Sequence, residues 1–196
     1  LVLLLFLEVI NAPYNEMNGR RMVPPAALMR GFPVYYPQGE GPQMNGVNGP
    51  VQILAYAPAT LISCPAPTIL LGALTAVRFF FVPVAVLFAK VPLVAPMGMR
   101  LICFLCFCLY RQTIPSLRFS ATMIHVDSVA LGVGLVSCFF LVLSFQRKKS
   151  RWLILSSITS VLAFFAKISM FPLGPALVLY LWVFKERKAS QIFLGT

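Results

Sequence analysis

Val129-Ala-Leu-Gly-Val-Gly-Leu-Val-Ser-Cys-Phe-Phe-Leu-Val-Leu-Ser-Phe145 is an apolar run without a single charge, and Gln146-Arg147-Lys148-Lys149 follows it directly. A helix needs about 20 apolar residues to cross the hydrocarbon of a bilayer, and fewer where other parts of the protein cover some of the helix. Cations beside such a run are typical of helix ends that meet lipid headgroups. The stretch therefore predicts a helix that spans a membrane and ends in a short basic loop.

The composition of the whole chain agrees with a lipid environment. Hydrophobic residues make up 59% of the sequence, charged residues only 11%, and the mean hydropathy is +0.86. Such a chain would expose too much apolar surface in water, so we expect a multi-pass integral membrane protein whose main partner is the lipid bilayer. The net charge of +11 is spread over the ends of apolar runs and does not form one stripe, which argues against nucleic acid as a partner.

Other apolar runs predict further spans or part-spans, at Leu1–Ile10, Ala66–Ala89, Met99–Ser116, Trp152–Ala166 and Phe171–Phe184. Together they predict an all-α, polytopic transmembrane helix bundle of about six spans or part-spans. A single membrane domain then covers 1–196, with the end of the first span at 1–10, a long outer-face loop with short helices at 11–65 and further spans at 66–196. In the loop, Pro24-Pro25-Ala-Ala-Leu-Met-Arg30 predicts one of these short helices, with proline near its start. Because the chain begins inside an apolar run, we expect it to be an N-terminal fragment of a larger membrane protein.

The distribution of basic residues predicts how the spans are oriented. Cations cluster in the loop 147–151 and again at 185–188, and two crossings separate these clusters, so both fit the cytoplasmic side. The polar loop 11–65 and the stretch 120–128 then fall on the outer face. The polar loop carries arginines too, but long loops are translocated largely regardless of charge. We therefore expect two polar stretches to meet at one face of the membrane.

Glu16 is the first candidate for catalysis, because it lies in the polar loop just after the first predicted span. A carboxylate at a membrane surface can act as a general base on a hydroxyl group, an effect typically worth about 10²–10⁴ in rate. The alternative is a solvated glutamate that pairs with Arg20, four residues later. The spacing alone leaves both interpretations open.

His125 and Asp127 are the second candidates. They are the only histidine and the only aspartate of the chain, and they lie at the outer end of the predicted span Val129–Phe145. Their spacing suits a strand or a loop better than one face of a helix. The structural alternative is that Asp127, together with Ser128, caps a helix that starts at Val129. The two roles are compatible.

Lys167 is the third candidate, because it lies between two apolar runs. A charge in such a place is costly, and it is usually paired or faces a water-filled cavity. The alternative is that its ammonium group extends along the helix to the membrane surface. Arg78 in the second predicted span and Arg118 near the third pose the same question. For Arg78 the sequence favours neutralisation of a backbone or helix-end dipole over substrate binding.

The segment Cys103-Phe-Leu-Cys106-Phe-Cys108 contains three thiols within a short distance. A zinc site needs a second pair of ligands at suitable spacing, and no such pair follows in the sequence. Small residues inside an apolar helix more often allow close packing between spans. We therefore predict packing and no metal at this segment.

Several segments together carry a family resemblance. Asn15-Glu16 precedes Arg20-Arg21, and Arg30-Gly-Phe-Pro-Val-Tyr-Tyr36-Pro37 follows; later the chain has Ile124-His-Val-Asp-Ser128 and Ala163-Phe-Phe-Ala-Lys167. This arrangement resembles the C-type glycosyltransferases that use polyprenyl-phosphate sugars, of the protein O-mannosyltransferase and aminoarabinose transferase type. That family places an Asp-Glu pair after its first span, then a short helix, a Gly-x-x-x-Tyr stretch and, later, a Gly-Leu-Ala-x-x-Thr-Lys passage.

The resemblance implies a function and a set of site residues. The reaction would move a sugar, without a cofactor, from polyprenyl phosphate to an acceptor on the outer face of a bacterial inner membrane. Glu16 would act as the base, while the following residues would bind the substrate: Arg20, Arg21, Tyr36, His125, Asp127 and Lys167. Basic residues would offset charge on the departing phosphate. Two positions depart from the family pattern, since Asn15 replaces its aspartate and Ala166 its threonine.

Two other classes of protein stay open at this point. In a transporter or a lipid flippase subunit, Arg78, Asp127 and Lys167 would line a pathway through the membrane. The two halves of the sequence show no inverted repeat, which such proteins often have. The remaining alternative is a non-catalytic fragment of a membrane protein.

Overall fold

The computed structural model describes residues 16–37, 39–41, 49–90 and 124–184, together with 102, 106, 192, 193 and 195. All regular structure in these ranges is helical, as the sequence predicted. The elements are α2 (Glu16–Met29), α3 (Pro50–Tyr56), η1 (Ala57–Leu61), α4 (Pro65–Lys90), α7 (Val126–Arg147), α8 (Ser150–Ala166), η2 (Ile168–Met170) and α9 (Leu173–Phe184).

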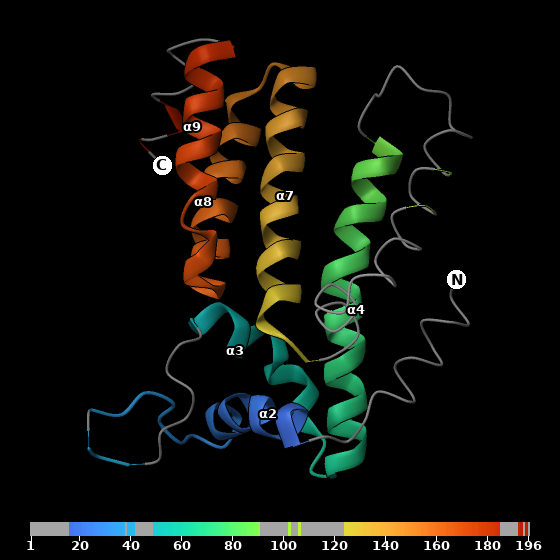
Figure 1. Ribbon diagram of the computed structural model, residues 1–196, viewed down its shortest axis with the longest axis vertical. Helices are drawn as coiled ribbons and strands as arrows, with labels where there is room; N and C mark the ends of the chain where they lie inside the picture. The colour runs from blue at the N-terminus through green and yellow to red at the C-terminus, as the bar shows by residue number, and fades with distance from the viewer. Residues whose placement is uncertain are drawn as a thin grey trace.

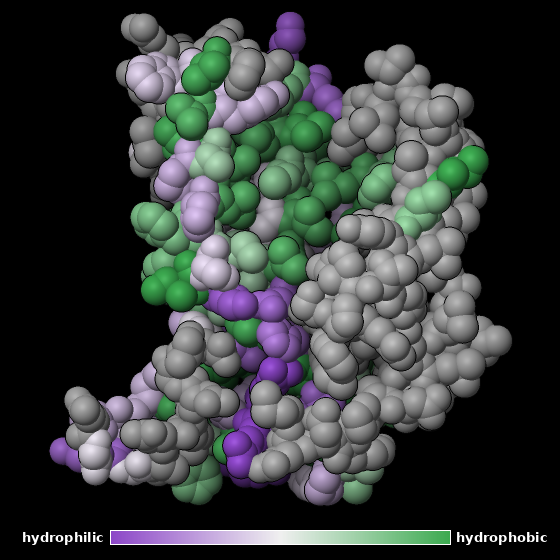
Figure 2. Space-filling view, viewed as in Figure 1, coloured by the Kyte–Doolittle hydropathy of each residue, from purple (hydrophilic) through white to green (hydrophobic). Residues whose placement is uncertain are grey.

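The long helices α4, α7, α8 and α9 lie side by side, and α2 lies across one end of them with α3 and η1 (Figure 1). From that end, α4 and α7 both run to the opposite end, α8 returns and α9 runs away again (Figure 1). We call the two ends of the bundle the α2 end and the basic end; the latter carries the turn 147–151 between α7 and α8. Figure 2 shows a mostly hydrophobic band between hydrophilic residues at the two ends.

Two helices are long and apolar enough to cross a membrane, Pro65–Ala89 and Val126–Arg147. They correspond to two of the predicted spans, each slightly longer than expected. The predictions for 152–166 and 171–184 also coincide with helices, α8 and α9, which are apolar but shorter. The predicted spans Leu1–Ile10 and Met99–Ser116 lie outside the described residues, apart from positions 102 and 106.

A proline and a glycine allow α4 and α7 to approach closely. Pro83 lies inside α4 and has no N–H, so the carbonyl of Phe79 loses its usual helical donor. On α7, Gly132 faces this same carbonyl, and a Cβ atom on Gly132 would collide with it. The glycine therefore lets the two backbones touch where the proline has interrupted the hydrogen bonding of α4.

Small residues also pack α7 against α8, which share the most extensive contact in the bundle. The hydroxyl group of Ser137 donates to the carbonyl of Ser156 at 2.7 Å, and Ser156 donates to the carbonyl of Ser137 at 2.8 Å. Both serines are fully buried. Such reciprocal hydrogen bonds fix the register of two apolar helices, because burial of an unpaired hydroxyl group would be unfavourable.

The polar loop holds more helix than the sequence predicted. A short helix was expected from Pro24 with proline at its start, but α2 begins at Glu16 and contains Pro24 and Pro25 in its interior. An interior proline costs about 3 kcal/mol in an isolated helix. Tertiary contacts offset this cost, because Met22 is buried in the core of the α2 end.

That core joins the crossing helix to the bundle. It consists of buried side chains from six elements and from the segment just before α7: Met22, Tyr56, Ala59, Ala76, Ile124, Val129, Ala130 and Ala166. The start of α3 is held against the end of α8 by Gly49, where a Cβ atom would collide with the carbonyl of Phe165. These contacts bring polar residues from separate segments of the chain together at the α2 end of the bundle.

Candidate functional site

The site is built on the first turn of α7. His125 has an extended backbone (φ −137°, ψ 142°) and is the N-cap of the helix. Its Nδ1 atom accepts a hydrogen bond from the backbone N–H of Asp127 at 3.1 Å and lies 3.1 Å from the Oδ2 atom of Asp127. The hydroxyl group of Ser128 donates to the carbonyl of His125 at 2.9 Å. The structural alternative, in which Asp127 and Ser128 cap a helix starting at Val129, is therefore wrong.

The reason for this difference is that the imidazole takes the role expected of the carboxylate. A side chain at the N-cap usually satisfies one free N–H of the first turn. Here Nδ1 of His125 does so, and α7 starts one residue later, at Val126. The carboxylate of Asp127 also interacts with a group outside its own helix.

Asp127 forms an ion pair with Lys167, through Oδ1 and Nζ. Lys167 is the C-cap of α8, with an extended backbone, and its N–H donates to the carbonyl of Ala163 at 3.0 Å. The exposed fractions of the two side chains are 32% for Lys167 and 24% for Asp127. Lys167 thus has a carboxylate partner at the α2 end, in agreement with the paired alternative.

Tyr56, at the end of α3, holds the chain just before α7. Its hydroxyl group donates to the carbonyl of His125 at 2.9 Å and lies 3.3 Å from the N–H of the same residue. The side chain is fully buried. Burial raises the pKa of Tyr56 to about 12, since the phenolate would lose its hydration. Tyr56 is therefore a neutral hydrogen-bonding group that fixes the position of His125.

Arg21 connects α2 to the same place. One of its guanidinium nitrogens donates to the carbonyl of Ile124 at 2.8 Å. Burial lowers the pKa of Arg21 from its ordinary value, while the nearby Tyr56 and Asp127 act in the opposite direction. The guanidinium remains a cation at neutral pH, because its ordinary pKa is above 12.

We call these side chains the polar cluster: Arg21, Tyr56, His125, Asp127 and Lys167. They come from four segments that are distant in the sequence, and hydrogen bonds or an ion pair link each of them to the start of α7. Apart from His125, its two cations and one carboxylate leave an excess of one positive charge. The cluster is partly accessible to solvent, which suits the recognition of an anionic group such as a phosphate.

Not all predicted site residues belong to the polar cluster. Glu16 is the first residue of α2, but its side chain lies outside the described residues. Arg20 is exposed, and it points away from its neighbour Arg21 because successive residues on a helix are about 100° apart. Tyr36 packs beside Gly41 in the loop after α2, and that loop extends away from the bundle (Figure 1).

Arg78 and Cys106 can also be placed. Arg78 is exposed in the middle of α4, away from the polar cluster. Cys106 is exposed, while Cys103, Cys108 and Arg118 lie outside the described residues. Within the ranges that the structure describes, no group of three metal-ligating side chains could hold a metal ion.

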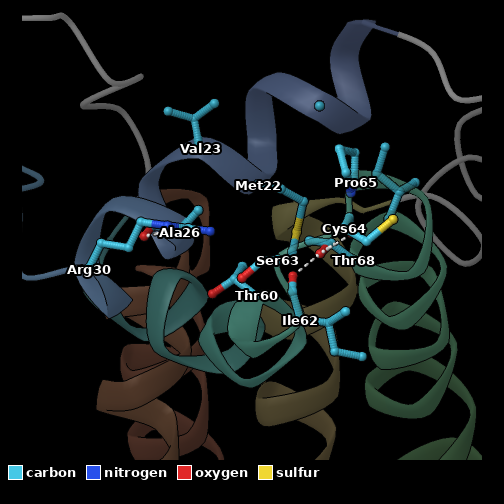
Figure 3. Close-up of a pocket in the computed structure, with 12 residues that line it drawn as sticks. Met22, Val23, Ala26, Arg30, Thr60, Ile62, Ser63, Cys64, Pro65 and Thr68 are labelled. Carbon is cyan, nitrogen blue, oxygen red and sulfur yellow. Dashed lines mark hydrogen bonds between the residues drawn. The ribbon is translucent and has the colours of Figure 1, made fainter.

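A pocket of about 280 Å³ lies between α2, η1 and the start of α4 (Figure 3). Its wall on α2 is mostly apolar, with Met22, Val23 and Ala26, and Arg30 stands at one side. On the opposite wall, the hydroxyl group of Thr68 is 2.8 Å from the carbonyls of Ile62 and Cys64. The shape and lining suit an apolar chain better than a sugar.

Sequence reasoning missed Tyr56 and this pocket. Tyr56 lies in a mostly apolar segment that leads to a predicted span, and a single hydroxyl group in such a segment does not indicate a site. The pocket depends on α2 lying across η1, which is a tertiary arrangement. The spacing of Met22, Val23 and Ala26 could have indicated the apolar face of a helix. This spacing was overlooked, because the helix was expected to start only at Pro24.

Comparisons of this chain with family models, with curated proteins and with solved structures find no match. The class defined by the structure is therefore a helical bundle with two helices of membrane-spanning length and a polar cluster at one end.

Proposed function

We propose that the protein is a membrane glycosyltransferase that moves a sugar from a polyprenyl-phosphate donor to an acceptor at the α2 end of the bundle. One observation carries the proposal: Arg21 and Lys167 lie around the same helix start, at the end of two helices long enough to cross a membrane. In a membrane, the ends of such helices lie between the lipid headgroups and the hydrocarbon. A lipid-linked sugar presents its phosphate in the same region. The resemblance of the polar segments to C-type glycosyltransferases supports the same conclusion.

The proposed reaction is a direct displacement at the anomeric carbon. Glu16 accepts the proton of an acceptor hydroxyl group, and the acceptor oxygen forms a bond to the anomeric carbon. The bond between that carbon and the phosphate oxygen breaks, and its electron pair leaves with the polyprenyl phosphate. Arg21 and Lys167 stabilise the negative charge that grows on the phosphate.

The remaining residues would support this step. Asp127 positions Lys167 through their ion pair, and His125 positions Asp127 through the first turn of α7. Arg20 and Tyr36, which belong to α2 and the loop after it, would contact the donor or the acceptor. The apolar pocket beside α2 would accommodate the first part of the isoprenoid chain. The α2 end would then face the outside of a bacterial inner membrane.

The proposal is tested by sugar transfer in reconstituted vesicles. The full-length protein is supplied with polyprenyl-phosphate sugars, and release of polyprenyl phosphate is measured for wild type and for Glu16→Gln. We expect Glu16→Gln to lower turnover by about 10²-fold or more, with normal membrane insertion. Glu40→Gln makes the same chemical change at an exposed loop residue and should keep wild-type turnover.

Three results would count against the proposal. Equal turnover of wild type and Glu16→Gln would remove the carboxylate from the mechanism. Absence of transfer with every polyprenyl-phosphate sugar would remove the reaction itself. Movement of the intact sugar lipid across the bilayer, without cleavage, would favour the flippase alternative.

A further inference from the structure

The basic end of the bundle carries four cations in the turn between α7 and α8: Arg147, Lys148, Lys149 and Arg151. All four side chains are exposed. The turn is short because Lys148 adopts a left-handed backbone (φ 49°), so α8 can begin at Ser150. The first turn of α8 adds positive potential, since it has no acidic residue.

Two of these cations lie close to the ring of one tryptophan, Trp152. The guanidinium carbon of Arg147 lies 5.9 Å from the centre of the Trp152 ring, and that of Arg151 lies 5.1 Å from it. Phe140 stacks on Trp152 with ring centres 5.8 Å apart, which fixes the indole. Both guanidinium groups are therefore within the range of a cation–π interaction with the same indole.

No carboxylate in the described part of the chain forms an ion pair with Arg147 or Arg151; the ion pairs there belong to Asp127 at the opposite end. A guanidinium group offers several N–H donors in a geometry that suits a phosphate group, and no carboxylate of the described residues competes for these two. The turn therefore has the charge and the donors for an anionic ligand.

The surface next to the turn indicates what the anion belongs to. On α8, Leu155, Ile158 and Leu162 follow Arg151 at spacings of four, seven and eleven residues, which places them on one side of the helix. Their exposed fractions are 38%, 45% and 40%. An apolar stripe that begins at a cation matches a molecule with an anionic head and an apolar chain.

We infer that the turn 147–152 binds the phosphate headgroup of an anionic phospholipid, whose acyl chain lies along the exposed stripe of α8. This site lies at the opposite end of the bundle from the polar cluster. It requires that the bundle lie in a bilayer, but it does not depend on sugar transfer.

Quenching of Trp152 fluorescence tests the inference. The chain has two tryptophans, so Trp182→Phe leaves Trp152 as the only reporter. The variant is placed in vesicles of phosphatidylcholine with a minor fraction of phosphatidylglycerol. Two preparations are compared, with bromine near the top of the acyl chains in each. In one the phosphatidylglycerol is brominated, and in the other an equal fraction of the phosphatidylcholine is brominated. The membrane charge is the same in both preparations. We expect at least about threefold stronger quenching when phosphatidylglycerol carries the bromine.

Two further measurements separate this site from a general attraction. The preference should disappear in Arg147→Gln/Arg151→Gln and persist in Arg30→Gln, which removes an exposed arginine at the α2 end. In the protein with Arg147 and Arg151 intact, the preference for phosphatidylglycerol should fall markedly in about 1 M salt, where the Debye length is about 3 Å.

Equal quenching by the two brominated lipids would overturn the inference. A preference that survives the double arginine substitution or high salt would also overturn it. Loss of the preference on adding millimolar inorganic phosphate at constant ionic strength would show that the turn binds free phosphate, which contradicts a lipid ligand.

Discussion

Lys167 at the end of α8 forms an ion pair with Asp127 in the first turn of α7, although 40 residues separate them in the sequence. The pair links α7 and α8 at the α2 end of the bundle. At the basic end, the turn 147–151 links the same two helices. Both partners are partly buried, so the pair is more than a surface contact. It determines where the positive charge of Lys167 lies relative to Arg21.

The ion pair should contribute to stability in a double-mutant cycle. Asp127→Asn and Lys167→Met should each lower the free energy of unfolding in detergent by about 1–2 kcal/mol, because each leaves a partly buried charge without its partner. The double variant should lose less than the sum of the two. Strict additivity would show that the side chains do not interact. Lys148→Met, at an exposed position, should have little effect.

Tyr56 should make stability depend on alkaline pH. The ordinary tyrosine pKa is about 10, and burial raises it to about 12 in the folded protein. Between pH 10 and pH 12, therefore, the hydroxyl group of Tyr56 keeps its proton in the folded state and loses it in the unfolded state. The stabilisation is complete below pH 10 and is lost as the pH rises through 12. Tyr56→Phe cannot ionise, so the stability of wild type should fall relative to this variant by roughly 3 kcal/mol over that range.

Below pH 10 the same substitution should be destabilising. Tyr56→Phe removes the hydrogen bonds to the backbone of His125, at a cost of about 1–2 kcal/mol. Denaturant unfolding of both proteins at a series of pH values measures the two effects together. A difference in stability that stays constant from pH 9 to pH 12 would contradict the buried, neutral tyrosine.

Gly132 should be intolerant of a side chain. Gly132→Ala places a methyl group against the carbonyl of Phe79, so α4 and α7 must separate, and we expect a loss of about 1–3 kcal/mol. Gly19→Ala is the matched control, since no atom lies within 4 Å of its new Cβ and α2 would gain helix propensity. Thermal unfolding in detergent compares them. Equal midpoints would mean that the helices are not in close contact.

The serine pair between α7 and α8 should show coupling. Ser137→Ala and Ser156→Ala each remove one of the reciprocal hydrogen bonds, and we expect a coupling energy of about 0.6–2 kcal/mol. Ser144→Ala is a control within α7, because Ser144 donates to the carbonyl of Leu141 in its own helix. Absence of coupling between the two serines would contradict the register of α7 against α8.

The helices of the bundle could be predicted from the sequence, because their apolar runs are long and end in charges. The run before Arg147 gave the position of α7 to within three residues. By contrast, α2 was placed too late, since Pro24 and Pro25 are strong local signals for a helix start. Burial of Met22 outweighs those signals, and burial is not visible in the local sequence.

The candidate site was predictable in part. The scarcity of His125, Asp127 and Lys167 in an apolar chain identified them, because a charge near lipid needs a reason to be there. Their mutual contacts depend on how α8 returns beside α7, which only the fold provides. The choice of His125 as the N-cap could not be predicted, since aspartate and serine are preferred at that position and both follow directly.

Photochemical labelling tests the central proposal most directly. A polyprenyl-phosphate sugar with a photoreactive group beside the phosphate is bound to the full-length protein in vesicles, and the labelled peptides are identified. We expect labels in α2 and in residues 124–128, several-fold weaker in Arg21→Gln and unchanged in Lys148→Met. Labelling of the basic end instead, or equal labelling of Arg21→Gln and wild type, would contradict a sugar-phosphate site at the polar cluster.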